Sequence, residues 1–214
     1  YSDGIEFWGS RLYRHLSNGA DNTAKTIAHK CGFRFNADTT KRSGFSIEGI
    51  ETVRAIRCHA TDNIGDGFGY LSPTAQNTIP KILEENCFSA RNGWNGSGNN
   101  DNGSSAHNDV YVIRVGGEHK ENYGPNVVDV LAAQSFNIGV YAHDSNGTTS
   151  GDCNFQVGQF SADYVPSVMY LQNCVSSGSS YDRYRFSGGT FFDLGGFDGD
   201  ASDVGQILGE EDIP

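Results

Sequence analysis

The chain lacks long apolar runs, an excess of basic side chains and helical periodicity. It contains no stretch of about 18 apolar residues, so no segment is predicted to cross a membrane as a helix. The 26 Asp and Glu residues outnumber the 15 Lys and Arg residues, and a net charge of −11 argues against binding to nucleic acid or to an anionic membrane. The chain starts at Tyr1 without a charged-then-apolar leader, and we expect it to be a fragment of a longer protein.

The sequence also lacks the motifs of several common active sites. It has no Cys-x-x-Cys pair of the kind that binds zinc, no nucleophile elbow, no phosphate-binding loop and no HExxH motif. Asp198, Asp200 and Asp203 are spaced as calcium ligands are, but the remaining ligands of an EF-hand are missing. We therefore expect no cofactor, with calcium as the weak alternative, and we interpret residues 198–214 as an acidic C-terminal tail.

Glycine and aromatic residues are abundant. There are 28 Gly, 13 Phe, 10 Tyr and 2 Trp residues, while only 36 % of the chain is hydrophobic. The aromatic side chains require a buried core, and 214 residues are enough to form one. Short apolar runs that alternate with polar turns rich in Gly and Asn favour an all-β protein.

A six-residue pattern recurs along the chain. The segments CGFRFN at 31–36, CHATDN at 58–63 and CFSARN at 87–92 each place a cysteine five residues before an asparagine. Similar segments begin at 117, 158 and 188, so that most repeats follow one another after about 30 residues. Two or three short strands per repeat predict a parallel β-solenoid, in which stacked coils share one core.

The repeat predicts two columns of stacked side chains. Equivalent residues in neighbouring coils are expected about 4.8 Å apart, which is the spacing of adjacent strands. Cysteine suits a tight interior position, whereas asparagine suits a turn with left-handed backbone and can hydrogen-bond along the stack. The predicted inward column contains Cys31, Cys58 and Cys87 as reduced thiols, continued by Gly117, Gly158 and Gly188. The predicted second column contains Asn36, Asn63, Asn92 and Asn122, continued by Asp163 and Asp193.

This repeat resembles that of the right-handed parallel β-helix superfamily, which includes pectate-lyase-like enzymes and phage tailspikes. The resemblance covers about residues 25–195 and is closest to the tailspikes, which are acidic, trimeric and directed at bacterial surface polysaccharide. It implies a right-handed parallel β-helix of about six to seven coils over residues 26–197, after a lead-in or truncated first coil at 1–25. It also implies a homotrimer that is extracellular or on the virion surface.

Three polar loops are candidate walls of a polysaccharide site, at residues 96–109, 143–152 and 176–182. In a solenoid such loops stack along one edge, where a long polymer can bind, although solvated surface turns are an equal alternative. Asp62 and Glu121 occupy the same repeat position two coils apart, and Arg91 lies between them. This column is interpreted either as an acid pair with a substrate-binding cation or as a surface charge ladder, and the ladder is favoured.

The segment between the first two loops carries the densest set of ionisable side chains outside the tail, and we place the site there. Glu118 and Glu121 are the first choices for the carboxyl groups, of which one requires a raised pKa. A loop histidine could act as a base that a neighbouring aspartate orients. The expected catalytic residues are Glu118, Glu121, Asp109, Asp144, His107 and His143. The expected substrate contacts are Arg114, Arg91, Trp94, Asp62 and Asp66, the last of which also fits an Asp-Gly turn.

The residues and the resemblance together predict binding and cleavage of an extracellular bacterial polysaccharide by acid–base chemistry of carboxyl groups. The enzyme would be a glycoside hydrolase or a polysaccharide lyase. The alternative is a structural or adhesive β-helix that binds without catalysis. A convergent pair of carboxyl groups would distinguish the two, because a β-helix by itself implies no activity.

Overall fold

The computed structural model describes residues 52–71, 79–93, 102–146, 153–158, 166–178 and 189–199, together with the backbone of strands β1 to β5 and β21. Within these residues the protein is all-β and contains no helix. The strands are β1 Ile5–Trp8, β2 Arg11–Tyr13, β3 Lys25–His29, β4 Gly32–Arg34, β5 Phe45–Glu48, β6 Thr52–Ile56, β7 His59–Thr61, β8 Phe68–Leu71, β9 Lys81–Glu85, β10 Phe88–Ala90, β11 Ser104–His107, β12 Tyr111–Val115, β13 Glu118–Lys120, β14 Val127–Val130, β15 Gln134–Ile138, β16 Tyr141–His143, β17 Phe155–Gly158, β18 Val168–Gln172, β19 Val175–Ser177, β20 Thr190–Asp193 and β21 Ile207–Leu208.

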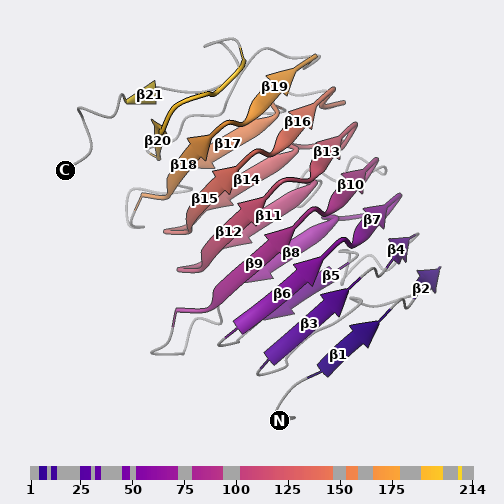
Figure 1. Ribbon diagram of the computed structural model, residues 1–214. Coiled ribbons are helices and arrows are strands. Elements are labelled where there is room, and N and C mark those ends of the chain that lie inside the picture. The colour runs from indigo at the N-terminus through magenta and orange to yellow at the C-terminus, as the bar shows by residue number, and fades with distance from the viewer. Residues whose placement is uncertain are drawn as a thin grey trace.

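Three parallel sheets run side by side along the structure (Figure 1). Sheet A has the order β1-β3-β6-β9-β12-β15-β18-β20-β21, sheet B the order β2-β4-β7-β10-β13-β16-β19, and sheet C the order β5-β8-β11-β14-β17. The chain passes from sheet A to sheet B and then to sheet C, before it returns beside its own earlier strand in sheet A. The predicted all-β, parallel architecture is therefore confirmed, and the arrangement is consistent with a β-helix or solenoid.

The segments at the two ends of the chain also contribute to the sheets. Strands β1 and β2, which lie within residues 1–25, pair with β3 and β4 and extend sheets A and B. Strand β21 pairs with β20, and Asp198 forms an isolated bridge with Val175. The acidic segment 198–214 thus contains residues that continue the parallel pairing.

Residues with left-handed backbone form the corners between the sheets. They follow the last strand residue of sheet A or of sheet B in successive passages of the chain. At the corner from sheet A to sheet B they are Arg57, Asn86, Gly116, Gly139 and Asn173, and at the corner from sheet B to sheet C they are Asp62, Arg91, Glu121, Asp144 and Gly178. From the sequence we expected the asparagine of each repeat to have left-handed backbone. In the structure the residue before the asparagine has this conformation, and the asparagine side chain points into the interior.

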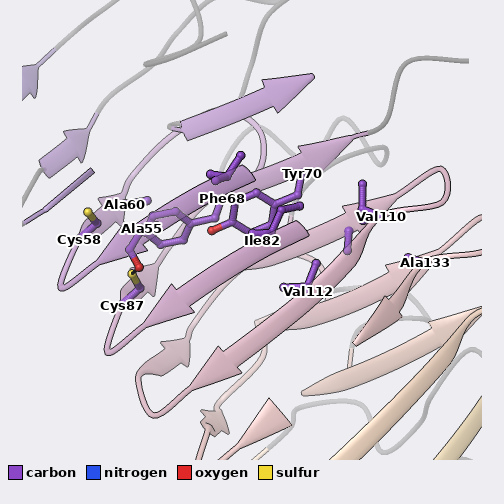
Figure 2. Packing of buried hydrophobic residues seen from close by; sticks show 12 residues of the cluster. Ala55, Cys58, Ala60, Phe68, Tyr70, Ile82, Cys87, Val110, Val112 and Ala133 are labelled. Atoms are coloured by element: carbon purple, nitrogen blue, oxygen red, sulfur yellow. Dashed lines mark hydrogen bonds between the residues drawn. The ribbon is translucent and has the colours of Figure 1, made fainter. Parts of the chain in front are cut away.

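The predicted stacking of Cys58 and Cys87 is confirmed. Each residue directly precedes its strand in sheet B, and those strands pair in register. Both side chains are buried as thiols, and Figure 2 shows them at the same end of neighbouring strands. The register next aligns Gly117 with this column, as predicted, since Glu118 pairs with Phe88.

Beyond Gly117 the predicted column is wrong. Val140 and Cys174 occupy the next two positions, because Tyr141 and Val175 continue the pairing in sheet B. Gly158 instead ends β17 in sheet C, where it pairs with Val130. Cys31 and Gly188 lie outside the described residues.

Asn63, Asn92 and Asn122 form a buried ladder of hydrogen-bonded amides. Asn63 Nδ2 donates to Asn92 Oδ1 at 2.8 Å, and Asn92 Nδ2 donates to Asn122 Oδ1 at 2.9 Å. The ladder then crosses to sheet C, where Asn122 donates to Asn126 at 2.7 Å and Asn126 donates to Asn154 at 2.8 Å. Every side chain in it is fully buried, so each amide group requires these partners.

The predicted continuation of this ladder through Asp193 is wrong. Asp193 lies in β20 of sheet A, where it pairs with Leu171. Asn36 and Asp163 lie outside the described residues.

Two apolar clusters fill the interior. The first contains Val53, Ala55, Cys58, Ala60, Phe68, Tyr70, Ile82, Cys87, Ala106, Val110, Val112 and Ala133 (Figure 2). The second contains Val127, Val140, Ala142, Phe155, Val157, Met169, Leu171, Cys174 and Phe191. Strand alternation explains the burial, because β9, β12, β15 and β18 all show exposed or half-buried residues alternating with buried ones.

Candidate functional site

The outer face of sheet B brings several of the predicted site residues together. In β10, β13 and β16 the middle residue points inward, so the first and third residues form two outward columns. One column contains His59, Phe88, Glu118 and Tyr141, and the other contains Thr61, Lys120 and His143, with Ala90 fully buried between Thr61 and Lys120. The corner residues Asp62, Arg91, Glu121 and Asp144 follow directly and continue the same face.

Glu118, Lys120, Tyr141, His143 and Asp144 form what we call the histidine cluster. Glu118 Oε1 lies 3.0 Å from His143 Nε2 and 2.8 Å from Lys120 Nζ. On the other side of the ring, His143 Nδ1 lies 2.7 Å from Asp144 Oδ2. The imidazole ring therefore lies between two carboxylates. A neutral ring can donate to only one of them, whereas a doubly protonated ring can donate to both.

The charge state of Glu118 is set by its neighbours. The Lys120 ammonium, followed by His143, lowers the pKa of the Glu118 carboxyl group against the opposing effect of desolvation. Glu118 is therefore ionised at neutral pH, which makes it an acceptor or electrostatic partner. A catalytic acid requires a raised pKa, so of the two roles that the sequence left open for Glu118, its surroundings support the ionised carboxylate.

Aromatic side chains flank the histidine cluster. The Tyr141 ring stacks on the His143 ring with 4.1 Å between centroids, and Tyr141 is 39 % exposed. On the neighbouring strand, the Phe88 ring lies 5.5 Å from Lys120 Nζ and 5.6 Å from the His59 ring. The face therefore combines exposed aromatic surface with hydrogen-bonding groups.

Asp62, Arg91 and Glu121 form the charge ladder that the sequence favoured. Arg91 Nε lies 2.7 Å from Asp62 Oδ1, and Arg91 Nη1 lies 3.5 Å from Glu121 Oε2. The hydrogen bond to Asp62 is the main reason that the pKa of Arg91 is raised. The Arg91 side chain is 45 % exposed, so solvent screening limits the contribution of these pairs to stability.

His107 and Asp109 do not join this group. They lie at the turn from sheet C to sheet A, whereas His143 and Asp144 lie at the turn from sheet B to sheet C. Part of the segment predicted as a loop at 96–109 is strand β11, which pairs with β8 and β14 in sheet C. Desolvation lowers the pKa of His107 to about 4, opposed by nearby Asp129, so His107 is neutral at physiological pH.

Arg114 and Asp66, which were predicted as substrate contacts, are buried. Arg114 is fully inaccessible and lies 3.1 Å from Asp129 Oδ1. Asp66 accepts hydrogen bonds from Asn102 and from Ser105 Oγ, at 2.8 and 2.7 Å. Burial raises the pKa of Asp66 to about 6 despite these bonds. Neither side chain can contact a polymer at the surface of this structure. Trp94 lies outside the described residues.

A buried polar network around Glu84 was not predicted. Glu84 Oε2 accepts hydrogen bonds from Tyr70 Oη at 2.7 Å and from Ser104 Oγ at 2.8 Å. Glu84 Oε1 lies 3.1 Å from His119 Nε2, an ion-pair distance without hydrogen-bond alignment. Burial alone would raise the pKa of Glu84, but the neighbouring His119 and Arg114 lower it to about 2.

The network continues from Ser104 to the next strand. Arg114 Nε donates to Ser104 Oγ at 2.9 Å, and Arg114 Nη1 also donates to Asn137 Oδ1 at 3.2 Å. The Ser135 hydroxyl donates to the second oxygen of Asp129. The sequence does contain a signal for these positions, because the alternation that buries Ile82 and Val112 also turns Glu84 and Arg114 inward.

Other kinds of site are not found in the described part of the chain. Within it, no group of three or more His, Cys, Asp or Glu side chains is arranged to hold a metal ion. The described residues also include no helix long and apolar enough to cross a membrane. Comparisons with protein-family models, with curated proteins and with solved structures gave no match.

Proposed function

We propose that the protein binds an extracellular polysaccharide along the outer face of sheet B. The observation that carries this proposal is the register of sheet B, which aligns the exposed Tyr141 and the half-buried Phe88 with ionisable groups over neighbouring strands. Adjacent strands lie about 4.8 Å apart, so the aligned side chains repeat along the direction in which a linear polymer would extend. The exposed Tyr141 ring and the fixed polar groups beside it are the combination that sugar rings and their hydroxyl groups require.

The proposed binding surface depends on the sheets enclosing one core. We infer that the chain forms a right-handed parallel β-helix of about six to seven coils, because connections between parallel strands of one sheet are right-handed in about 98 % of cases. Each passage through sheets A, B and C would then be one coil. This fold, together with the polysaccharide ligand, supports an extracellular or virion-surface location for the protein.

The charges on this face favour a polymer rich in neutral hydroxyl groups. Arg91 is paired with Asp62 and Glu121, and Lys120 is paired with Glu118. Neither cation is therefore available to neutralise a polyanion without first losing a carboxylate partner. Ion-paired groups still have lone pairs and N–H bonds directed outward, and these can hydrogen-bond to hydroxyl groups.

Cleavage of the bound polymer is the second candidate function. It is favoured by one observation, the contacts of both His143 ring nitrogens with carboxylates. In that arrangement His143 would move the proton, Asp144 would orient the ring, and ionised Glu118 would stabilise positive charge. Binding without cleavage is supported by the lowered pKa of Glu118, which keeps this carboxyl group ionised and unable to act as the acid.

Affinity electrophoresis of the purified chain in gels that contain different bacterial polysaccharides tests the binding. We expect Tyr141→Ala to reduce retardation by the glycan that binds the wild type about tenfold, a loss that matches about 1.4 kcal/mol. Ile138→Ala, on sheet A, has a similar exposed fraction (36 % against 39 %) and is the matched control. Equal retardation of both variants would place the binding site elsewhere.

Cleavage is tested separately with the glycan that binds. Release of reducing ends marks a hydrolase, and a rise in ultraviolet absorbance from unsaturated products marks a lyase. We expect His143→Gln to abolish either signal while the chain still binds the glycan. If the wild type binds the glycan but releases no product, the protein is a binding module only.

A further inference from the structure

A serine, a histidine and a glutamate lie in line inside the protein. Ser89 Oγ lies 2.8 Å from His119 Nδ1, and Glu84 Oε1 lies 3.1 Å from Nε2 on the other side of the ring. When Nδ1 accepts the serine proton, the proton of the neutral ring is on Nε2 and faces the carboxylate. A nucleophile, a base and a group that orients the base are the parts of a serine-based acyl-transfer site. None of the three residues is more than 2 % exposed, so an acyl group for this serine must come from the protein itself.

The register of the sheets brings these groups together with two amides of the asparagine ladder. Ser89 and His119 are the central, inward residues of β10 and β13, and they pair with each other in sheet B. Asn92 and Asn122 follow them at the same position of the two coils and are also fully buried. Glu84 comes from β9 in sheet A, where strand alternation turns it inward. Two neighbouring passages of the chain therefore supply every group.

The side-chain amide of Asn122 lies beside the serine hydroxyl. Asn122 Nδ2 is 3.4 Å from Ser89 Oγ, and the carbonyl carbon Cγ is bonded to that nitrogen. The carbonyl oxygen Oδ1 of the same amide accepts two hydrogen bonds, from the backbone N–H of Asn92 at 3.1 Å and from Asn92 Nδ2 at 2.9 Å. Two N–H donors at about 2.7–3.1 Å are what an oxyanion hole places around an oxygen that becomes negatively charged. The amide is thus held as an acyl group in a transfer site is held.

We propose that Ser89 and Asn122 become joined by an ester bond that forms within the folded chain and links two neighbouring coils. His119 takes the proton of the Ser89 hydroxyl as Oγ bonds to Cγ of Asn122, and the negative charge moves to Oδ1 between the donors of Asn92. The Cγ–Nδ2 bond then breaks, the proton passes from the histidine to the leaving nitrogen, and ammonia departs. Glu84 is the positioning residue, since it faces the imidazolium ring that forms. The step consumes no water and no other reactant.

Burial of the site favours the ester once it has formed. Ser89 and Asn122 are both fully inaccessible, so water does not reach the bond to hydrolyse it, and the released ammonia is diluted in the solvent. Asn126 Oδ1 loses the amide donor of Asn122 but keeps the backbone N–H of that residue as a donor at 3.4 Å. The ladder therefore stays partnered at this rung, and β10 becomes covalently tied to the corner that follows β13.

Mass spectrometry of the purified, unfolded wild-type chain tests this proposal. We expect a mass that is lower than that of the sequence by one ammonia molecule. After digestion with trypsin, the peptides 82–91 and 121–183, which contain Ser89 and Asn122, should appear as one joined species. Mild alkali hydrolyses esters, so it should separate the two peptides with the uptake of one water molecule. Ser89→Ala should have its full sequence mass, and His119→Gln should contain at least tenfold less of the joined species.

Ser105→Ala is the matched control, because Ser105 is a fully buried serine whose hydroxyl donates to Asp66 at 2.7 Å and not to a histidine. It should lose ammonia as the wild type does. A wild type with the full sequence mass would overturn the proposal, and this result does not depend on whether any variant folds. Loss of ammonia within a single peptide would also overturn it, because that change marks a cyclic imide at an asparagine. The proposal does not depend on the function assigned to sheet B, so either can fail alone.

Discussion

Neutralising Glu84 should destabilise the protein by about 3 kcal/mol at neutral pH. The substitution Glu84→Gln keeps the size of the side chain but removes the charge that faces His119 and Arg114. The pKa of Glu84 is about 2 in the folded protein and 4.5 for the unperturbed group, a difference that corresponds to about 3.4 kcal/mol at about 1.36 kcal/mol per pKa unit. Glu84 is 2 % exposed, so solvent screening hardly reduces this figure.

The general cost of breaking a buried ion pair gives a similar value for the loss of stability in Glu84→Gln. Removing one partner of a buried ion pair costs about 3–5 kcal/mol, because the remaining charge loses its compensation. For a domain with about 5–15 kcal/mol of total stability, such a loss is large and easily measured. Urea unfolding, followed both by circular dichroism and by aromatic fluorescence, measures it and reveals any intermediate.

The pH dependence provides the sharpest test of this reasoning. A depressed folded-state pKa contributes stability above the unfolded pKa, and that contribution is lost as the pH falls through the folded value. The difference between wild type and Glu84→Gln should therefore be full above about pH 5 and shrink towards zero near pH 2. Glu85→Gln, on the outward side of the same strand, is the control and should cost less than about 0.5 kcal/mol. If the two variants unfold at the same urea concentration at pH 7, the Glu84 charge does not stabilise the fold.

Three further predictions follow from buried groups. Asp66→Asn should stabilise the protein by up to about 3 kcal/mol at pH 8 but not below pH 4. The folded-state pKa of Asp66 is raised from 3.8 to about 6, so the stability linked to its protonated form is lost as the pH rises through 6. An equal effect on urea unfolding at both pH values would contradict this prediction. Asn92→Ala should cost about 2–4 kcal/mol in the same assay, because it removes the middle amide of the buried ladder between Asn63 and Asn122. The exposed neighbour Arg91→Ala should cost less than about 1 kcal/mol. Cys58, Cys87, Cys153 and Cys174 should stay unmodified by an aqueous thiol reagent until urea unfolds the chain, as peptide mass mapping would show, since all four are buried. Rapid labelling of Cys58 or Cys87 in the native protein would contradict the predicted interior column.

The repeat pattern could be predicted from sequence because it depends on local requirements. Cys58 and Cys87 occupy tight inward positions and Asn63 and Asn92 pair along the interior, so each copy needs the same residue types at the same spacing. The charge ladder of Asp62, Arg91 and Glu121 could be predicted for the same reason, since residues at the same position of successive repeats lie in register on neighbouring strands.

The fifth copy of the repeat was missed because it departs from the pattern at both ends. Val140 stands where the earlier copies have cysteine or glycine, and Ser145 stands where they have asparagine. Gly158 matched the pattern by composition only and belongs to sheet C. Strand pairing, rather than residue type, decides which positions are equivalent, and pairing depends on contacts that are distant in sequence.

The residues of the candidate site could be predicted only where they lie on the repeat. Glu118, Glu121, His143 and Asp144 all fall on the repeat and so meet on one face, whereas His107 and Asp109 fall outside it and lie at another corner. Arg114 was assigned to the surface because charged residues are usually exposed. Its burial depends on Asp129 and Glu84, and their proximity follows only from the assembled sheets.

The amide ladder and the Glu84 network have different consequences for how the coils find one another. Every rung of the ladder from Asn63 to Asn122 is chemically the same, so a chain that stacked one coil out of step would still pair asparagine with asparagine. The acidic, basic and hydroxyl groups of the interior differ from strand to strand, and a shifted stack would bury Arg114 or Glu84 without an opposite charge. We expect these groups to specify the stacking order of the coils, because only the correct order pairs every buried charge. Single buried polar residues fix the alignment of coiled coils in the same way. Replacing the whole set with apolar residues would then leave a chain that still folds into parallel sheets but populates misaligned and domain-swapped forms, which native mass spectrometry can count.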